Sequence, residues 1–365
     1  MNNHSVRNQI MIVGGYGDVG RTISIELGNK FPGNVIVAGR NYAKADELSA
    51  YTGRNVLPRR IDISSDSEYD NVLENVSLVV VCIDQKDTKF IEACIKRRIN
   101  YIDITANYEF SLKVEKLNDL AREYNTTILI SVGLAPGLTN LLASYGKSKL
   151  DEMSQLNLYI LGGLGEPHGS ATVNWFISKF SDKFYVYENG IRKLVKAFDK
   201  GRKSLFPESI GLRKAYRFDF SDHQILGKNL KLDYSSMWVC FEPSFMSHLL
   251  YILRKLGLFE LLRFSFFKRL LFLCLKIKIG SSNLFIIKAD CKGKKDNVSK
   301  IFSYSVSGSK EHMATGLFAA DVAELMYTSE YSFGVYHIEQ LVESPIDFIE
   351  KFTKQHGYRF YHNEN

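Results

Sequence analysis

Near the start of the chain, residues 13–20 read Val13-Gly14-Gly15-Tyr16-Gly17-Asp18-Val19-Gly20 and follow the apolar run Gln9-Ile10-Met11-Ile12. Gly15, Gly17 and Gly20 fit the pattern G-x-G-x-x-G between a strand and a helix. The first glycine of this pattern allows a tight turn, the second lets a pyrophosphate approach the backbone, and the third lets the helix pack closely on the strand. The helix start then offers free N–H groups to an anion. We therefore predict a dinucleotide site formed by Gly15, Tyr16, Gly17, Asp18, Val19 and Gly20.

A second apolar strand, residues 34–40, ends about 20 residues after the glycines, where the ribose of the nucleotide is read. An NAD site usually places Asp or Glu there, but this chain has Gly39-Arg40-Asn41, with Lys44 close behind. A guanidinium matches a 2′-phosphate in charge and geometry. Arg40 therefore favours NADP(H) over NAD(H). The alternative is an ordinary solvated arginine at a strand end.

The composition is that of a folded globular protein. The chain has 365 residues, of which 45% are hydrophobic and 24% charged, which fits two or three domains. Its net charge of +7 favours anionic small molecules or a membrane surface, and no basic and aromatic block indicates nucleic acid. The five cysteines are scattered without C-x-x-C spacing, so we expect reduced thiols. Since no apolar signal region precedes the first strand, we expect a cytoplasmic enzyme.

Helical and extended segments alternate through the first part of the chain. The run Val76-Ser77-Leu78-Val79-Val80-Val81-Cys82 is typical of a central parallel strand buried on both faces. Further strands are predicted at 55–63, 100–104 and 127–132, with helices at 42–53, 67–73, 90–98 and 112–124. The alternation predicts an α/β fold with a doubly wound parallel sheet, a Rossmann domain over residues 1–145. Ligands bind beyond the carboxyl ends of such strands, so we expect cofactor contacts from Asp62, Thr105, Pro136 and Gly137.

From residue 146 to residue 310 the pattern indicates a second, α+β domain with a mostly antiparallel sheet. Asn189-Gly190 predicts the turn of a hairpin over 183–195. A helix is predicted at 170–180, an apolar helical insert at 243–279, and strands at 156–161, 216–220, 237–241, 283–292 and 301–308. We expect residues 311–365, with helices at 311–328 and 346–356 and a strand at 358–361, to return to the Rossmann domain.

Several segments together resemble the saccharopine dehydrogenase-like oxidoreductases. They are the glycine pattern, residues 37–40, Tyr101-x-Asp103-x-Thr105, Gly133-Leu134-Ala135-Pro136-Gly137-Leu138-Thr139-Asn140, and residues 162–167, 174–178 and 334–339. Ala106-Asn107-Tyr108-Glu109 is similar to the segment that carboxynorspermidine dehydrogenases carry after the same strand. The resemblance implies an NADP-linked enzyme that moves a hydride to or from an imine carbon, and so forms or breaks a secondary amine. It also implies a homodimer joined through the sheet domain, with the substrate in a cleft between the domains.

Such a reaction needs an acid that supplies protons to the imine nitrogen and the departing hydroxyl. Asp103, Tyr108 and Glu109 stand at or after the end of the strand at 100–104, so they are the candidate catalytic residues. The alternative for Asp103 is a loop or helix cap. His168, at the start of the second domain, is a further candidate, and the alternative is an exposed loop histidine. No cluster of metal ligands stands out in the sequence, and we expect no metal.

A run of cations in the second domain suits the carboxylates of an amino-acid-derived substrate, so we expect an anionic small molecule. The run consists of Arg192, Lys193, Lys196, Lys200, Arg202, Lys203, Arg213, Lys214 and Arg217. A run of charges is also typical of a solvated surface, which is the alternative.

Residues 256–279 are apolar but interrupted by cations, so they are not predicted to cross a membrane. The cations are Arg263, Lys268, Arg269, Lys276 and Lys278. One interpretation is a basic amphipathic helix in weak contact with an anionic membrane surface, and the other is a helix packed on its own domain or on a dimer mate.

Two alternative functions of the protein follow. One is reduction of a carbonyl or enoyl group in a lipid-like molecule, with residues 245–275 lining an apolar pocket, and the other is a non-catalytic NADP-binding protein at a membrane.

Overall fold

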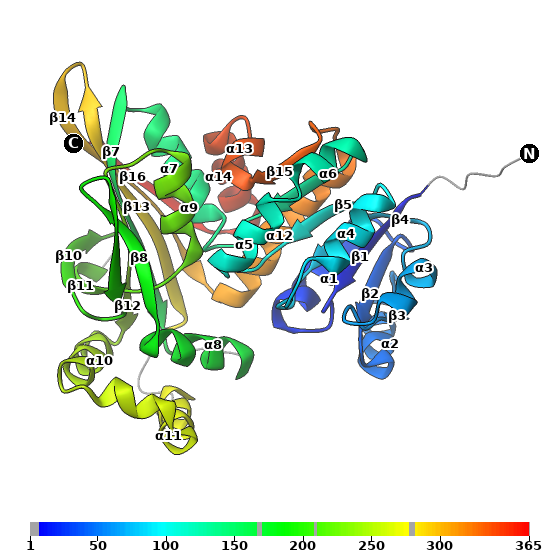
Figure 1. Cartoon of the computed structure of the whole chain (residues 1–365), viewed down its shortest axis with the longest axis horizontal. Coiled ribbons are helices and arrows are strands. Elements are labelled where there is room, and N and C mark those ends of the chain that lie inside the picture. The colour runs from blue at the N-terminus through cyan, green and yellow to red at the C-terminus, as the bar shows by residue number, and fades with distance from the viewer. Residues whose placement is uncertain (1–6, 166–169, 208–209, 277–281, 365) are drawn as a thin grey trace, which may run out of the picture. The chain divides into compact units, whose positions relative to one another are not determined.

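The computed structural model shows two compact units, which Figure 1 draws with their helices and strands labelled. The first unit comprises Met1–Gly137 and His312–Glu343, and the second comprises Leu138–Glu311 and Ser344–Asn365. The residues that the structure describes are 7–165, 170–207, 210–276 and 282–364.

The first unit is built on a seven-stranded parallel sheet in the order β15-β6-β5-β4-β1-β2-β3. Its elements are β1 (Gln9–Val13), α1 (Asp18–Lys30), β2 (Val35–Gly39), α2 (Tyr42–Tyr51), β3 (Val56–Arg60), η1 (Asp66–Glu68), α3 (Tyr69–Val72), β4 (Val76–Val81), α4 (Lys89–Lys96), β5 (Asn100–Asp103), α5 (Tyr108–Glu115), α6 (Asn118–Glu123), β6 (Thr127–Ile130), α12 (Glu311–Thr328), β15 (Gly334–His337) and α13 (Ile338–Leu341). The strand order reverses at β1, which confirms the predicted doubly wound Rossmann fold.

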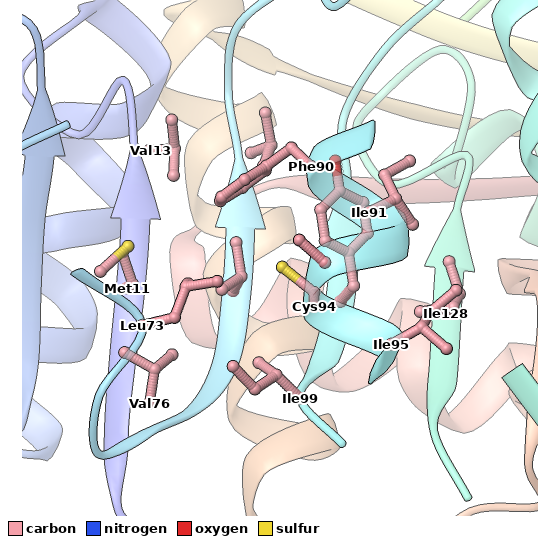
Figure 2. Packing of buried hydrophobic residues seen from close by; sticks show 14 of the residues in the cluster. Met11, Val13, Leu73, Val76, Phe90, Ile91, Cys94, Ile95, Ile99 and Ile128 are labelled. Carbon is pink, nitrogen blue, oxygen red and sulfur yellow. The ribbon is translucent and has the colours of Figure 1, made fainter. Parts of the chain in front are cut away.

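The core of this unit forms where α4 packs on the central strands. Figure 2 shows Phe90, Ile91 and Cys94 of α4 against side chains of the sheet, among them Met11 and Ile128. These side chains are at most 2% exposed. Fully burying one such side chain stabilises a fold by about 1.5–3 kcal/mol. In the predicted central strand, β4, every residue except Ser77 is buried.

Two features of this unit differ from the sequence-based prediction. The helix expected over 112–124 is two helices, α5 and α6, and α5 starts earlier because Asn107 caps it. The edge strand β15 was not predicted, since four residues give too short a pattern. It pairs in parallel with β6, with Gly334 opposite Thr127.

The second unit is built on a nine-stranded sheet. Its elements are α7 (Leu138–Ser148), β7 (Glu152–Gly163), α8 (Ser170–Ser181), β8 (Lys183–Glu188), β9 (Ile191–Lys196), β10 (Gly201–Phe206), β11 (Gly211–Arg217), α9 (Ser221–Asn229), β12 (Tyr234–Glu242), α10 (Phe245–Lys255), η3 (Leu258–Arg263), α11 (Ser265–Lys276), β13 (Leu284–Lys295), β14 (Val298–Ser309), α14 (Pro345–His356) and β16 (Arg359–Glu364). The main strand order is β10-β11-β12-β7-β13-β14-β16, and β8 pairs with β12 and β9.

The strand pairs of this sheet are antiparallel except for β7 with β12, which are parallel. The hairpin predicted at Asn189-Gly190 is confirmed as β8 and β9. Both turn residues have positive φ, 56° and 71°, as a two-residue turn between twisted strands requires. The sheet also curls. Nζ of Lys288 on β13 lies 2.8 Å from Oγ of Ser204 on β10, although three strands stand between β10 and β13 in the sheet order.

The C-terminal residues divide between the two units, whereas the sequence-based expectation returned all of 311–365 to the Rossmann domain. Nearly all of α12, with β15 and α13, belongs to the first unit, but α14 and β16 belong to the second. β16 pairs with β14, and the ring of Phe360 stacks on that of Tyr304 with 6.4 Å between centroids. Tyr145 of α7 lies 4.7 Å from the same Tyr304 ring. This aromatic cluster holds the end of the chain on the second sheet.

The first boundary between the units also lies earlier than the expected residue 145. Helix α7 belongs to the second unit because it packs on β13. A Cβ on Gly146 would lie 2.3 Å from Sγ of Cys291, so glycine is what allows this close approach of helix and strand.

Candidate functional site

The turn between β1 and α1 leaves no room for side chains at two of its glycines. A Cβ on Gly20 would lie 2.3 Å from the carbonyl oxygen of Gly14, and a Cβ on Gly15 would lie 2.8 Å from that of Ile12. Gly17 is less crowded and is the N-cap of α1, where no side chain caps the helix. The first N–H groups of a helix have no partner within the helix, so the start of α1 offers them to a phosphate.

Tyr16 lies over the end of β2 and explains why Gly39 has no side chain. A Cβ on Gly39 would lie 2.6 Å from the Tyr16 ring, and the N–H of Asn41 donates to the Tyr16 hydroxyl at 3.1 Å. Asn41 also caps α2 by accepting from the N–H of Lys44 at 3.2 Å. Arg40 stands between these ordered residues and is exposed. Its backbone is therefore fixed while its guanidinium is accessible.

Asp62 follows β3 and closes a local turn. The N–H and the hydroxyl of Ser64 donate to Oδ1 of Asp62 at 3.0 and 2.7 Å. These hydrogen bonds, helped by the nearby Arg40 and Arg60, hold the pKa of Asp62 below its usual value. Asp62 is thus a charged carboxylate within electrostatic reach of Arg40, and it reduces the positive potential at the end of β2.

Asp103 lies in a buried polar network at the ends of β4 and β5. Its Oδ2 accepts from the Tyr101 hydroxyl and from Nε2 of Gln85, both at 2.7 Å, and its Oδ1 accepts from the N–H of Thr105 at 2.8 Å. Asp103 is only 1% exposed, and this burial raises its pKa to about 7 even though the hydrogen bonds favour the charged form. Asp103 therefore ties the loop after β5 to the loop after β4.

Gln85 is the member of this network that the sequence did not reveal. Its side chain bridges Asp103 and the Tyr101 hydroxyl, which Nε2 reaches at 2.6 Å. Its Oε1 is buried and has no hydrogen-bond partner among the described residues. Only the pairing of β4 with β5 brings this glutamine to Asp103, and no local pattern signals that pairing for a single side chain.

The loop after β5 leads into α5, which carries the other two candidate acids. Oγ1 of Thr105 accepts from the N–H of Asn107 at 3.2 Å, and Asn107 caps α5 by accepting from the N–H of Phe110. Tyr108 and Glu109 are the first two residues of α5, and Tyr108 is half-buried while Glu109 is exposed. Glu109 also lines a shallow surface depression along this helix. The structure therefore joins Asp103 and Thr105 in one network and places Tyr108 and Glu109 just beyond it.

Pro136 and Gly137 form a tight turn at the end of Met1–Gly137, the first of the two segments that make up the first unit. Gly137 has φ +136°, and a Cβ there would lie 2.1 Å from the carbonyl oxygen of Gly133. A backbone bridge between Leu134 and Gly137 closes the turn. The predicted contact of this turn with the cofactor stays a prediction, but its shape depends on glycine at residue 137.

A second buried network links distant parts of the first unit. Nδ1 of His337 lies 2.8 Å from Oγ of Ser131, and its Nε2 lies 3.1 Å from Oε1 of Glu115. His337 is 3% exposed and Ser131 is 1% exposed. The network ties the end of β6 and β15 to α5. Sequence reasoning missed it because 206 residues separate Ser131 from His337.

Comparison with known proteins shows what this unit is. Residues 10–129 match the saccharopine dehydrogenase NADP binding domain. The chain thus has an NADP-binding domain of the saccharopine dehydrogenase type. The match to an NADP binding domain confirms the prediction of NADP as the cofactor, and it supports an NADP-dependent oxidoreductase.

The structure of the chain is similar to that of a solved enzyme over nearly its whole length. The apo histidine-tagged saccharopine dehydrogenase (L-Glu forming) from Saccharomyces cerevisiae matches with a TM-score of 0.74 and 12% identity, covering 98% of this chain and all of that one. A weaker likeness, with a TM-score of 0.47 and 12% identity, is to the C. glutamicum DAP dehydrogenase in complex with DAP, over 95% of this chain and 99% of that one. At such identities the first likeness shows a shared fold.

The residues of the NADP-binding domain fit the cofactor. The glycine turn is a cradle that a Cβ at residue 15 or 20 would fill, and α1 begins without a side-chain cap. No acidic residue stands at the end of β2, where Arg40 is exposed. This arrangement suits a pyrophosphate at the helix start and a 2′-phosphate at the strand end.

In the second unit, most cations of the predicted anion-binding run engage neighbours of their own. Arg217 is 2% exposed and pairs with Glu188 at 2.7 Å, and Lys193 pairs with the same carboxylate at 2.8 Å. Lys196 pairs with Glu260. Arg213 pairs with Glu242, and Arg202 donates to the Tyr159 hydroxyl. Two further cations lie over aromatic rings, Arg192 over Tyr185 and Lys214 over Tyr216. Most of the run therefore stabilises the fold, which leaves Lys200 and Lys203 as exposed cations.

Some predicted residues lie outside the part of the chain that the structure describes. They are His168, with the neighbouring Glu166 and Pro167, and Lys278.

Proposed function

We propose that the chain is an NADP-dependent oxidoreductase that transfers a hydride at a C–N bond, between an imine and a secondary amine, of an amino-acid-derived, carboxylate-bearing substrate. The observation that carries the proposal is the match of residues 10–129 to the saccharopine dehydrogenase NADP binding domain, together with a glycine turn and an exposed Arg40 that fit this cofactor. The fold shared with a saccharopine dehydrogenase of the L-Glu-forming type supports a reaction at a C–N bond.

The cofactor-binding residues have separate tasks in this proposal. The N–H groups of Asp18, Val19 and Gly20 at the start of α1 bind the pyrophosphate, while Tyr16 holds the end of β2 in place. Arg40 binds the 2′-phosphate. Bound NADPH supplies the hydride. Thr105 and the turn at Pro136 and Gly137 are proposed to form the wall of the nicotinamide pocket.

For the proton we propose Tyr108 or Glu109 rather than Asp103. An acid that protonates the imine nitrogen must reach the substrate, and Asp103 is 1% exposed with both carboxylate oxygens engaged. Asp103 acts instead as a positioning residue that holds the loop leading to α5. Glu109 is exposed in the first turn of that helix, and Tyr108 is half-buried beside it.

For the substrate we propose an anion whose carboxylates meet cations of the second unit. Lys200 and Lys203 are the members of the basic run that best suit this task, because they are exposed and the other members engage neighbours in the described structure. The homodimer and the cytoplasmic location stay predictions.

The proposal is tested by following the oxidation of NADPH with panels of substrates. One panel pairs 2-oxo acids or semialdehydes with amines, and a second contains enones and lipid-like carbonyl compounds. We expect consumption with the first panel. We also expect Glu109→Gln or Tyr108→Phe to lower kcat while NADPH binding is retained. Consumption only with the second panel would overturn the C–N assignment.

The alternative of a lipid reductase was based on residues 245–275 as the lining of an apolar pocket. Phe245, Ile252, Phe266 and Leu273 from this region are between 50% and 69% exposed. These side chains face solvent, so the amine reaction has the stronger support.

A further inference from the structure

Helices α10 and α11 of the second unit are drawn in yellow-green and yellow in Figure 1. Each helix has a stripe of exposed apolar side chains. The exposed apolar side chains recur every three or four residues, so each set lies along a single side of its helix. On α10 and its C-cap they are Phe245, Leu249, Ile252 and Leu256, and on α11 they are Phe266, Leu270 and Leu273. All seven are between 43% and 69% exposed. Exposed apolar surface of this extent marks an interaction site in a folded protein.

The opposite side of the same segment is anchored in the core of the second unit. Met246 and Leu250 of α10 are buried, as are Phe259 and Leu262 of η3. The ring of Phe259 lies 4.7 Å from that of Phe180 on α8. The exposed stripes therefore belong to a folded element that already has its own packed face.

The segment is also strongly basic. Residues 245–276 contain six cations, at 254, 255, 263, 268, 269 and 276, and one acid, Glu260, for a net charge of +5 out of +7 for the whole protein. Glu260 lies 3.3 Å from Lys196 and 3.9 Å from Arg254, so two cations already surround it. Four further cations are exposed on or between the two helices, namely Lys255, Arg263, Lys268 and Arg269.

We propose that α10, η3 and α11 dock the protein on an anionic phospholipid surface, with the helices lying in the interface plane. An apolar side combined with flanking lysine and arginine is the pattern of an interfacial helix, because the apolar groups enter the acyl boundary while the cations meet the headgroups. Among the described residues, no helix is both long and apolar enough to cross a bilayer.

A second copy of the chain is the less suitable occupant. A two-fold symmetric contact brings the same surface patch of both subunits together. That contact would bring together two copies of a patch that contains Arg263, Lys268 and Arg269, and no described acid on the two helices would compensate for them. Anionic lipid supplies the missing negative charge.

The experiment is flotation of the full-length protein with vesicles of neutral lipid and with vesicles that also contain phosphatidylserine. We expect the protein to float with the anionic vesicles and not with the neutral ones, and added salt should release it.

The charge variant combines Lys255→Gln, Lys268→Gln and Arg269→Gln. Each cation near an anionic surface strengthens binding about fivefold, so this variant should bind about a hundredfold more weakly. A matched control neutralises three exposed lysines elsewhere, Lys86→Gln, Lys96→Gln and Lys351→Gln, and should float like the wild type.

A second variant tests the apolar stripes with the cations intact, and combines Leu249→Gln, Ile252→Gln and Phe266→Gln. Because these side chains are exposed, the variant should fold and bind NADPH normally but lose vesicle binding. Failure of the wild type to float, or equal loss in the lysine control, would overturn the proposal. Self-association without vesicles that the apolar variant abolishes, combined with no vesicle binding, would assign the stripes to a second copy instead.

Discussion

Replacement of Arg40 by alanine should weaken NADPH binding selectively. A hydrogen bond to a charged group contributes about 1.5–3 kcal/mol, and the lower end applies here because Arg40 is exposed to solvent. A loss of about 1.5 kcal/mol corresponds to about a tenfold higher Kd for NADPH. NADH lacks the 2′-phosphate, so its Kd should not change. Calorimetric titration of both nucleotides into wild type and Arg40→Ala measures the difference.

Three further variants sharpen this test. Arg40→Lys keeps the charge but loses the planar guanidinium, so its Kd for NADPH should lie between those of the wild type and Arg40→Ala. Arg54→Ala removes another exposed arginine, which pairs with Asp46, and should leave both affinities unchanged. Asp62 lies within electrostatic reach of Arg40, so Asp62→Asn added to Arg40→Ala should recover part of the NADPH affinity. Equal weakening of NADPH and NADH by Arg40→Ala, or no weakening at all, would refute the assignment of the 2′-phosphate to Arg40.

Three other variants test parts of the structure around and beyond this contact. Gly20→Ala places a Cβ 2.3 Å from the carbonyl oxygen of Gly14. This substitution should lower the free energy of unfolding by about 1–3 kcal/mol and abolish NADPH binding. A normal melting temperature and normal NADPH binding would contradict the described geometry of the glycine turn. Burial raises the pKa of Asp103 from 3.8 to about 7, so the folded state binds this proton more tightly and the free energy of unfolding should fall as pH rises between those values. Asp103→Asn should flatten that slope in urea titrations, and an unchanged slope would show that another group causes it. Arg217→Met breaks a buried ion pair with Glu188 and should destabilise the protein by about 3–5 kcal/mol. Lys193→Met removes an exposed ion pair with the same carboxylate and should cost less than about 1 kcal/mol. Similar losses in the two variants would refute the different contributions of the buried and the exposed pair.

The Rossmann sheet could be predicted from the sequence because its determinants are local. Gly15 and Gly20 are required by contacts within a few residues of themselves, and the run from Val76 to Val81 is apolar enough to indicate a strand buried on both faces. The hairpin at Asn189-Gly190 was predictable for the same reason, since its turn requires two positive φ angles.

The remaining fold depends on pairings that no local pattern records. Strand β10 was not predicted because Gly201–Phe206 has two adjacent cations and only two apolar residues, in a stretch that also fits a solvated basic surface. The final strand was predicted as a strand but assigned to the Rossmann domain. Its place in the second unit follows from pairing with β14 and from the ring of Phe360 on Tyr304, contacts between residues far apart in the chain.

The candidate site shows the same division between local and distant signals. Arg40 and the glycines were predicted as site residues from spacing alone. Asp103 was predicted from its place at a strand end, but its burial and its partner Gln85 depend on the pairing of two strands. His337, which joins Ser131 to Glu115, gave no signal because these residues come from three separate elements.

The most direct test of the proposed reaction is to follow the hydride itself. NADPH carrying deuterium at the transferred position is incubated with the protein and the panel of 2-oxo acids or semialdehydes with amines, and the products are analysed by mass spectrometry and NMR. We expect a secondary amine with deuterium on the carbon bonded to nitrogen. Deuterium found only on carbons of reduced enones or alcohols, or in no product although NADPH binds tightly, would contradict it.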